Sequence, residues 1–157
     1  MPLDNLSPVP SRSPEAELLT SALWLIREPD RWCKRAFSRD RHRPEGGIVM
    51  QRCAVTAIQE AAYRDLSPIE PDFRLLLNRV YAAVADEIVI SAYPQFMFWF
   101  MQMFRTERRT NRCKIMWFND QRKTRHADVI RLFRQAIERL ESEAAGTIDT
   151  KQLMFAL

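Results

Sequence analysis

Glycine is scarce in this sequence, with 3 among 157 residues. A phosphate-binding loop needs several glycines at fixed spacing, because its backbone must approach the ligand closely. No such loop occurs, and no pair of carboxylates stands out as a catalytic motif. The sequence therefore contains neither a nucleotide-binding loop nor an acid/base pair of the common types.

Cysteine is also scarce, and its count is odd: the 3 cysteines are widely spaced. This pattern argues against a disulfide framework and favours a reducing compartment. Together with the 2 histidines, the cysteines include enough ligand types for zinc. None of them has the close spacing that zinc ligands usually show, so we expect no metal site and no cofactor.

The sequence has no apolar run long enough for an ordinary membrane span. Residues 88–104 form a run of 17 residues without a charge, interrupted by Pro94 and two glutamines. A bilayer span needs roughly 20 apolar residues. The first 13 residues have neither a basic start nor an apolar core, so they do not resemble a secretory signal. We expect a cytoplasmic protein and favour no membrane span.

The bulk composition predicts one folded domain. Apolar residues make up 46% and charged residues 28%, which is typical of globular rather than disordered chains. A chain of this length can bury a core of its own. Residues 1–12 contain three prolines and little apolar periodicity, so they are predicted to be a flexible tail. Residues 13–157 are predicted to form a single helical domain.

Apolar residues recur at helical spacing in several stretches. The first helix is expected to begin at Ser13, whose hydroxyl can cap it, and to end before Pro29. A second helix is predicted over residues 49–64, and a third over residues 67–86, where a serine and a glutamate form a capping box. Residues 30–47 are predicted to be a polar, arginine-rich connection.

The clearest helical pattern covers residues 125–141. Its apolar face is expected to form the core together with the aromatic segment 95–104. Gly146 is predicted to end this helix, and residues 106–112 are predicted to form a basic loop before it. The apolar face consists of Val129, Ile130, Phe133, Ala136, Ile137 and Leu140.

These patterns predict a mainly α fold: a compact single-domain bundle of about five helices. One short strand pair is the main alternative to an all-helical chain. It would join residues 88–90 to residues 114–118, because both stretches are apolar and short.

Positive charge is concentrated in two stretches. Residues 27–45 hold seven basic and four acidic side chains, and residues 105–125 hold eight and two. A basic patch is the footprint of a surface for nucleic acid or for an acidic partner. Aromatic residues interleave with the arginines in both stretches, and exposed rings can stack on bases. The alternative is that these are arginine-rich solvated loops, and no helix-turn-helix or zinc-finger pattern is present.

We interpret the chain as a non-catalytic binding or accessory protein whose basic surface contacts nucleic acid or an acidic protein partner. Asn119 and Asp120 either form a structural turn before the last helix or project as a polar pair into a cleft. The candidate binding residues are Arg105, Arg108, Arg109, Arg112, Lys114, Asn119, Asp120, Arg122, Lys123 and Arg125.

Two other functions remain open at this point. The segment 95–104 could make the protein a self-assembling or membrane-associated scaffold, with homo-oligomer contacts through Phe96, Trp99 and Phe100. Cys53, His126 and Asp120 have the residue types of a thiol enzyme's nucleophile, base and orienting group. Nothing local in the sequence brings these three together, so we assign no catalytic residue.

Four short motifs carry a family resemblance over roughly residues 16–140. They are Trp32, Cys53-Ala54-Val55-Thr56-Ala57, Phe118-Asn119-Asp120 and Ala127-Asp128-Val129. The chain resembles a group of small bacterial and phage proteins known only as a domain of unknown function. Those relatives carry Cys-Ala-x-Gly-Ala and Trp-Asn-Asp motifs, and this chain departs from them at Thr56 and Phe118. The resemblance implies a similar fold and, by association, an accessory role in a phage or mobile element. It implies no mechanism.

Overall fold

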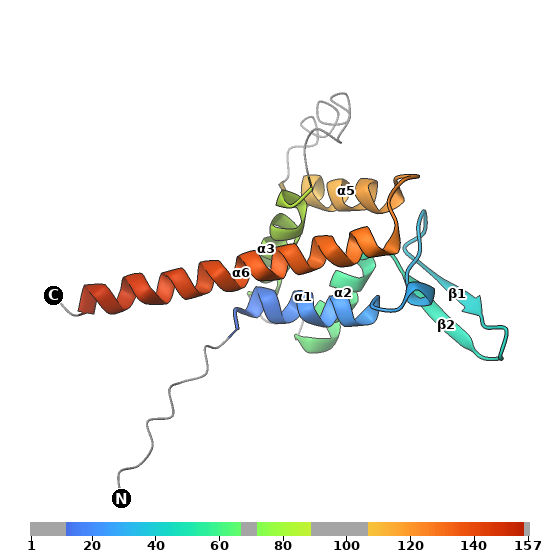
Figure 1. Cartoon of the computed structure of the whole chain (residues 1–157), viewed down its shortest axis with the longest axis horizontal. Helices are drawn as coiled ribbons and strands as arrows, with labels where there is room; N and C mark the ends of the chain where they lie inside the picture. Colours follow the sequence, from blue (N-terminus) through green and yellow to red (C-terminus); the bar gives the residue numbers. More distant parts are fainter. Residues whose placement is uncertain (1–11, 67–71, 89–106, 156–157) are drawn as a thin grey trace, which may run out of the picture.

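The computed structural model describes residues 12–66, 72–88 and 107–155, with side chains described for 12–66, 72–88 and 111–146. Within these residues the chain is mainly helical and has one short strand pair, which confirms the predicted fold class (Figure 1). The elements are α1 (Pro14–Leu25), the 3-10 turn η1 (Pro29–Arg31), β1 (Ser38–His42), β2 (Ile48–Arg52), α2 (Ala54–Asp65), α3 (Phe73–Asp86), α5 (Glu107–Asp120) and α6 (His126–Phe155).

Helix α1 begins as its sequence predicts. The Ser13 hydroxyl oxygen accepts a hydrogen bond from the backbone N–H of Ala16 at 3.1 Å, and Pro14 occupies the first helical position. Glu15 and Glu17 lie in the first turn, where a negative charge is favourable beside the positive end of the helix dipole. Pro29 follows the end of α1 and opens η1.

The strand pair lies elsewhere in the chain than expected. β1 and β2 form an antiparallel hairpin in which Ser38 pairs with Arg52 and His42 pairs with Ile48. Gly46 and Gly47 have φ angles of 93° and 89°, which allow the turn between the strands. The alternative pairing with residues 114–118 is wrong, because those residues lie inside α5.

The hairpin also shortens the second helix. The predicted helix over residues 49–64 begins only at Ala54, with Cys53 at its N-cap position. Residues 48–52 are extended instead, because they pair with β1 and because Ile48 and Val49 are β-branched. The connection predicted over residues 30–47 therefore contains a strand and the turn of a hairpin.

Two further boundaries differ from the prediction. The expected basic loop over residues 106–112 is helical from Glu107, so it forms the first half of α5. Gly146 does not end the last helix, which continues to Phe155. Glycine costs only about 1 kcal/mol in a helix interior, so a single one does not have to terminate a helix.

The core forms where α1 packs against α2 and α6 while α3 packs against α5. The predicted face of α6 is confirmed: Val129, Phe133 and Ala136 are fully buried. Small side chains on α2 let α1 approach closely, and three of them, Ala54, Ala57 and Ala61, are fully buried.

Several predictions fall on residues that the structure does not describe. They include the aromatic segment 95–104 with Phe96, Trp99 and Phe100, the capping box at residues 67–70, and Arg105. The predicted oligomer contacts, and the predicted contribution of segment 95–104 to the core, therefore lie outside the described residues. Among the helices that are described, none is both long and apolar enough to cross a membrane.

The elements define two ends of the molecule. The hairpin, the turn between α5 and α6 and the start of α6 lie together at one end, shown on the right in Figure 1. Helix α6 then runs beside α1 and extends beyond it toward the opposite end. The end that carries the hairpin therefore brings together segments from three parts of the sequence.

The continuity of α6 through Gly146 gives a testable prediction. Gly146→Ala should increase helicity, measured by far-ultraviolet circular dichroism, because alanine is favoured over glycine by about 1 kcal/mol in a helix. A Cβ at this position meets no atom within 4 Å.

The matched control is Gly47→Ala, which should instead lower the melting temperature, because the φ angle of Gly47 is 89°. A loss of helicity in Gly146→Ala would contradict the observed extent of α6.

Candidate functional site

A buried asparagine in the last turn of α5 holds together three segments of the chain. The Asn119 Oδ1 accepts hydrogen bonds from the indole N–H of Trp32 at 2.8 Å and from the backbone N–H of Ala54 at 3.2 Å. Its Nδ2 donates to the backbone carbonyl of Cys33 at 3.1 Å and to Oδ1 of Asp120 at 2.9 Å. We call these five residues the Asn119 junction.

The junction uses the full hydrogen-bonding capacity of the Asn119 side chain. An asparagine amide has two N–H donors and two acceptor lone pairs, and all four are occupied here. Asn119 is also fully buried. It therefore has no hydrogen-bonding group left for a ligand, which favours the structural one of its two predicted roles.

Asp120 fixes the loop that follows Trp32. Its Oδ1 accepts a hydrogen bond from the backbone N–H of Arg35 at 2.8 Å. Arg35 has a φ angle of 56°, a left-handed conformation that is unfavourable for a residue with a side chain. Beside it, the Lys34 ammonium donates to the carbonyl of Gln121 at 2.7 Å. The loop over residues 32–35 is thus fastened to the turn between α5 and α6.

The start of α6 is fixed in a way that the sequence did not reveal. Arg125 precedes the helix, and its backbone N–H donates to Oδ2 of Asp128 at 2.8 Å. Asp128 is the third helical residue, so it supplies half of a capping box, while Thr124 is not the cap. The His126 Nε2 lies 2.7 Å from the carbonyl oxygen of Ile26, which ties α6 to the end of α1.

The fastened segments form a surface rich in exposed cations. The loop and the hairpin contribute three arginines, and the turn between α5 and α6 contributes three basic residues. The first arginine-rich stretch identified in the sequence and the last part of the second, residues 120–125, therefore meet at one end of the molecule. We call this surface the basic end; it comprises Arg35, Arg39, Arg41, Arg122, Lys123 and Arg125.

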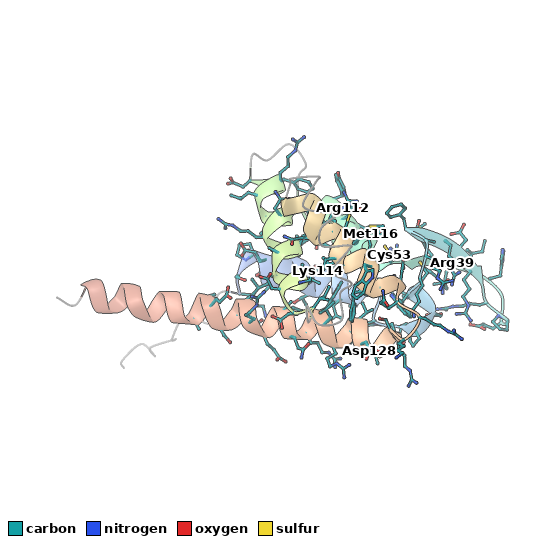
Figure 2. The ribbon with its side chains drawn as sticks, turned by 90° about the horizontal axis from the view of Figure 1, so that it is seen from above. Arg39, Cys53, Arg112, Lys114, Met116 and Asp128 are labelled. Atoms are coloured by element: carbon teal, nitrogen blue, oxygen red, sulfur yellow. The ribbon has the colours of Figure 1, made fainter. Side chains whose placement is uncertain are left out.

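Two of the predicted binding residues, Arg112 and Lys114, do not belong to the basic end. Arg112 is half-buried, with its guanidinium carbon 5.9 Å from the centre of the Tyr81 ring. Lys114 is also half-buried, and burial lowers the pKa of its ammonium although Asp86 opposes the shift. Figure 2 shows both on the ribbon of α5, apart from Arg39 on the hairpin. The side chains of Arg108 and Arg109 lie outside the described part of α5.

A half-open pocket of about 150 Å³ adjoins the basic end. It lies between the loop before β1, the start of α2 and the end of α5. Cys53 and Met116, which Figure 2 labels, contribute to its walls. Its lining residues are Arg35, Ala36, Phe37, Cys53, Met116, Asn119 and Asp120.

The pocket does not assemble the thiol site considered from the sequence. Cys53 and Asp120 line it, but His126 does not, since its ring bonds to the carbonyl of Ile26 and lies 5.8 Å from the ring of Trp32. The Cys53 sulfur also accepts a hydrogen bond from the backbone N–H of Thr56 at 3.4 Å. Cys53 therefore caps α2 and has no histidine base beside it in this arrangement.

Cys33 is the second buried thiol near the junction. Burial raises the pKa of its thiol to about 11, and the neighbouring Cys53 contributes to the rise while Arg39 opposes it. Cys33 is therefore a protonated, unreactive thiol at neutral pH. In the part of the chain with described side chains, no three metal-binding residues gather into a possible site.

The hairpin and the pocket are the features of the candidate site that the sequence analysis did not predict. Gly46-Gly47 between two short stretches with β-branched or charged residues was an available signal for a hairpin. The pocket had no such signal, because Arg35, Cys53 and Met116 come from segments far apart in the sequence.

The comparisons with known proteins identify the family of this chain. A family model described as a family of unknown function (DUF6197) matches residues 10–139. The chain belongs to this family, and the match includes the Asn119 junction, the basic end and the pocket. Neither a curated protein nor a solved structure matches the chain.

The Asn119 junction predicts a large effect from a small substitution. Asn119→Ala should lower the free energy of unfolding by about 2–4 kcal/mol, because it leaves buried groups of Trp32, Cys33 and Ala54 without a partner. Urea denaturation measures this change. Asn111→Ala, at a half-buried position on the same helix, is the control and should cost less than about 1 kcal/mol. Equal effects of the two substitutions would contradict the junction.

The pKa of Cys33 predicts how stability depends on pH. The folded protein keeps the thiol protonated to higher pH than the unfolded chain does. The contribution of the protonated Cys33 thiol to the free energy of unfolding is therefore complete below pH 9, and it is lost as the pH rises toward 11.

Urea denaturation across this pH range should show a loss of unfolding free energy in the unaltered protein. The loss should be smaller in Cys33→Ala. Cys113→Ala, a substitution on α5, should retain the full loss. If Cys33→Ala lost as much stability as the unaltered protein, the Cys33 thiol would not be the responsible group.

Proposed function

We propose that this member of a family of unknown function is a non-catalytic protein that binds nucleic acid through its basic end. One observation carries the proposal: hydrogen bonds from Lys34 and Arg35 to the end of α5 unite two arginine-rich segments into one surface. A surface of this kind can neutralise several phosphates of one strand at once. Release of their counterions then drives binding.

The cations of the basic end have no carboxylate partner among the described residues. Arginines elsewhere are often paired, as Arg52 is with Glu60 and Arg139 is with Glu87. Among the acidic groups near the basic end, Asp128 is engaged elsewhere, since it accepts from the backbone N–H of Arg125 and from the guanidinium of Arg131. An unpaired, exposed cation is available to a phosphate without breaking an internal ion pair.

An exposed aromatic ring favours nucleic acid over an acidic protein. Phe37 lies just before β1 between Arg35 and Arg39, and 57% of its surface is accessible. Bases can stack on an aromatic ring that lies beside arginines. The carboxylates of an acidic protein would bind only to the arginines and would make no use of the ring. We therefore place an acidic protein second among the partners.

The proposal has a cellular side. The odd number of widely spaced cysteines favours the cytoplasm, and the resemblance to small bacterial and phage proteins favours an accessory role in a phage or another mobile element. The Cys-Ala-x-Gly-Ala and Trp-Asn-Asp motifs of the relatives, present here in altered form, support this assignment by association.

Charge reversal at the basic end tests the proposal. Arg122→Glu with Arg125→Glu should weaken binding of a fluorescent oligonucleotide at least about tenfold in an anisotropy titration. It should also reduce the slope of log K against log salt concentration by about two. The control is Arg12→Glu with Arg74→Glu, which changes the net charge equally at exposed positions outside the basic end.

Three outcomes would overturn the proposal. The first is equal weakening by the two charge-reversed variants, and the second is binding that does not depend on salt. The third is binding to polyglutamate but not to the oligonucleotide, which would identify an acidic protein as the partner.

A further inference from the structure

We infer that the pocket beside Phe37 receives one unpaired nucleobase, so that the basic end prefers single-stranded nucleic acid. This inference rests on the proposed function and adds a specific contact to it. The pocket is continuous with the basic end, because Arg35 belongs to both. A strand held there by its phosphates would have the pocket within reach of its bases.

The walls of the pocket suit the flat faces of a base. Phe37, Ala36, Cys53 and Met116 line it with apolar or weakly polar surface. Bases stack on aromatic rings whatever their sequence, and each stacked base contributes about 1–3 kcal/mol. Phe37 is exposed in the absence of any ligand, although it is a large apolar side chain.

One polar group in the pocket can select among bases. Oδ1 of Asp120 accepts from Arg35 and from Asn119, while no donor within the described structure contacts its Oδ2. A carboxylate oxygen only accepts hydrogen bonds, so it suits an exocyclic amine such as that of cytosine or adenine. Thymine has no exocyclic amine and presents only its N3–H between two carbonyl oxygens, which a carboxylate repels, so it should bind more weakly.

The conformation of Arg35 fits a residue placed for binding. A left-handed backbone costs about 1 kcal/mol or more for a residue with a side chain, and here the hydrogen bond to Asp120 helps to hold it. The guanidinium of Arg35 has no carboxylate partner among the described residues. In this position it can bind the phosphate next to the base in the pocket.

The inference favours single strands for a steric reason. In a duplex, bases are stacked on their neighbours and their pairing edges are occupied. Only an unpaired or extruded base can enter a pocket and present its pairing edge to Asp120. The phosphates of a duplex can still reach the cations of the basic end.

Anisotropy titrations with three DNA probes test this inference: an adenine homopolymer, a strand of equal length without bases, and a duplex. The intact single strand should bind best. Phe37→Ala should weaken its binding about tenfold and leave binding of the baseless strand unchanged. Tyr63→Ala is the control, because Tyr63 is similarly exposed but lies on α2 outside the pocket lining.

A second variant separates recognition from folding. Asp120→Asn keeps one side-chain oxygen that accepts from the backbone N–H of Arg35. It replaces the other carboxylate oxygen, Oδ2, with an amide nitrogen that donates. It should therefore reverse the preference between adenine and thymine homopolymers, a result that mere loss of structure would not produce.

The outcomes distinguish the two proposals. Equal, salt-dependent binding of intact and baseless strands would overturn the base pocket and leave the basic end in place. Absence of binding to all three probes would overturn both. Equal effects of Phe37→Ala and Tyr63→Ala, or an unchanged base preference in Asp120→Asn, would also remove the pocket from recognition.

Discussion

The hydrogen bonds of one buried amide, that of Asn119, determine how the basic end of this protein is built. Its oxygen accepts from Trp32 and Ala54, and its nitrogen donates to Cys33 and Asp120. A buried polar group is costly unless its hydrogen bonds are satisfied, so the three segments must meet at this point for the amide to be buried. The loop after η1, the start of α2 and the end of α5 are therefore fixed relative to one another.

The surface charge follows from this arrangement. Asp120 and Gln121 come directly after Asn119, and they fasten Arg35 and Lys34 beside the turn that leads into α6. Like charges are thereby held close together, which opposes folding slightly and favours a polyanionic ligand. The pocket has the same origin, because its walls come from the three segments that the junction joins.

The sequence predicted the parts that depend on local patterns. The cap at Ser13 and the apolar face of α6 follow from helical spacing and were confirmed. The hairpin was missed because β1, with its charged side chains, has no buried face and so lacks the alternation that marks a strand. Asn119 could be interpreted as a turn residue, but its partners Trp32, Cys33 and Ala54 lie 65 to 87 residues away, and no local pattern encodes such contacts.

Native-state hydrogen exchange, followed by NMR, tests the Asn119 junction most directly. The indole N–H of Trp32 and the backbone N–H of Ala54 donate to the same Asn119 oxygen, so both should exchange slowly in the unaltered protein. In Asn119→Ser both should lose protection together, while amides in the buried middle of α6 stay protected. Fast exchange of either group in the unaltered protein, or full protection of both in the variant, would contradict the account.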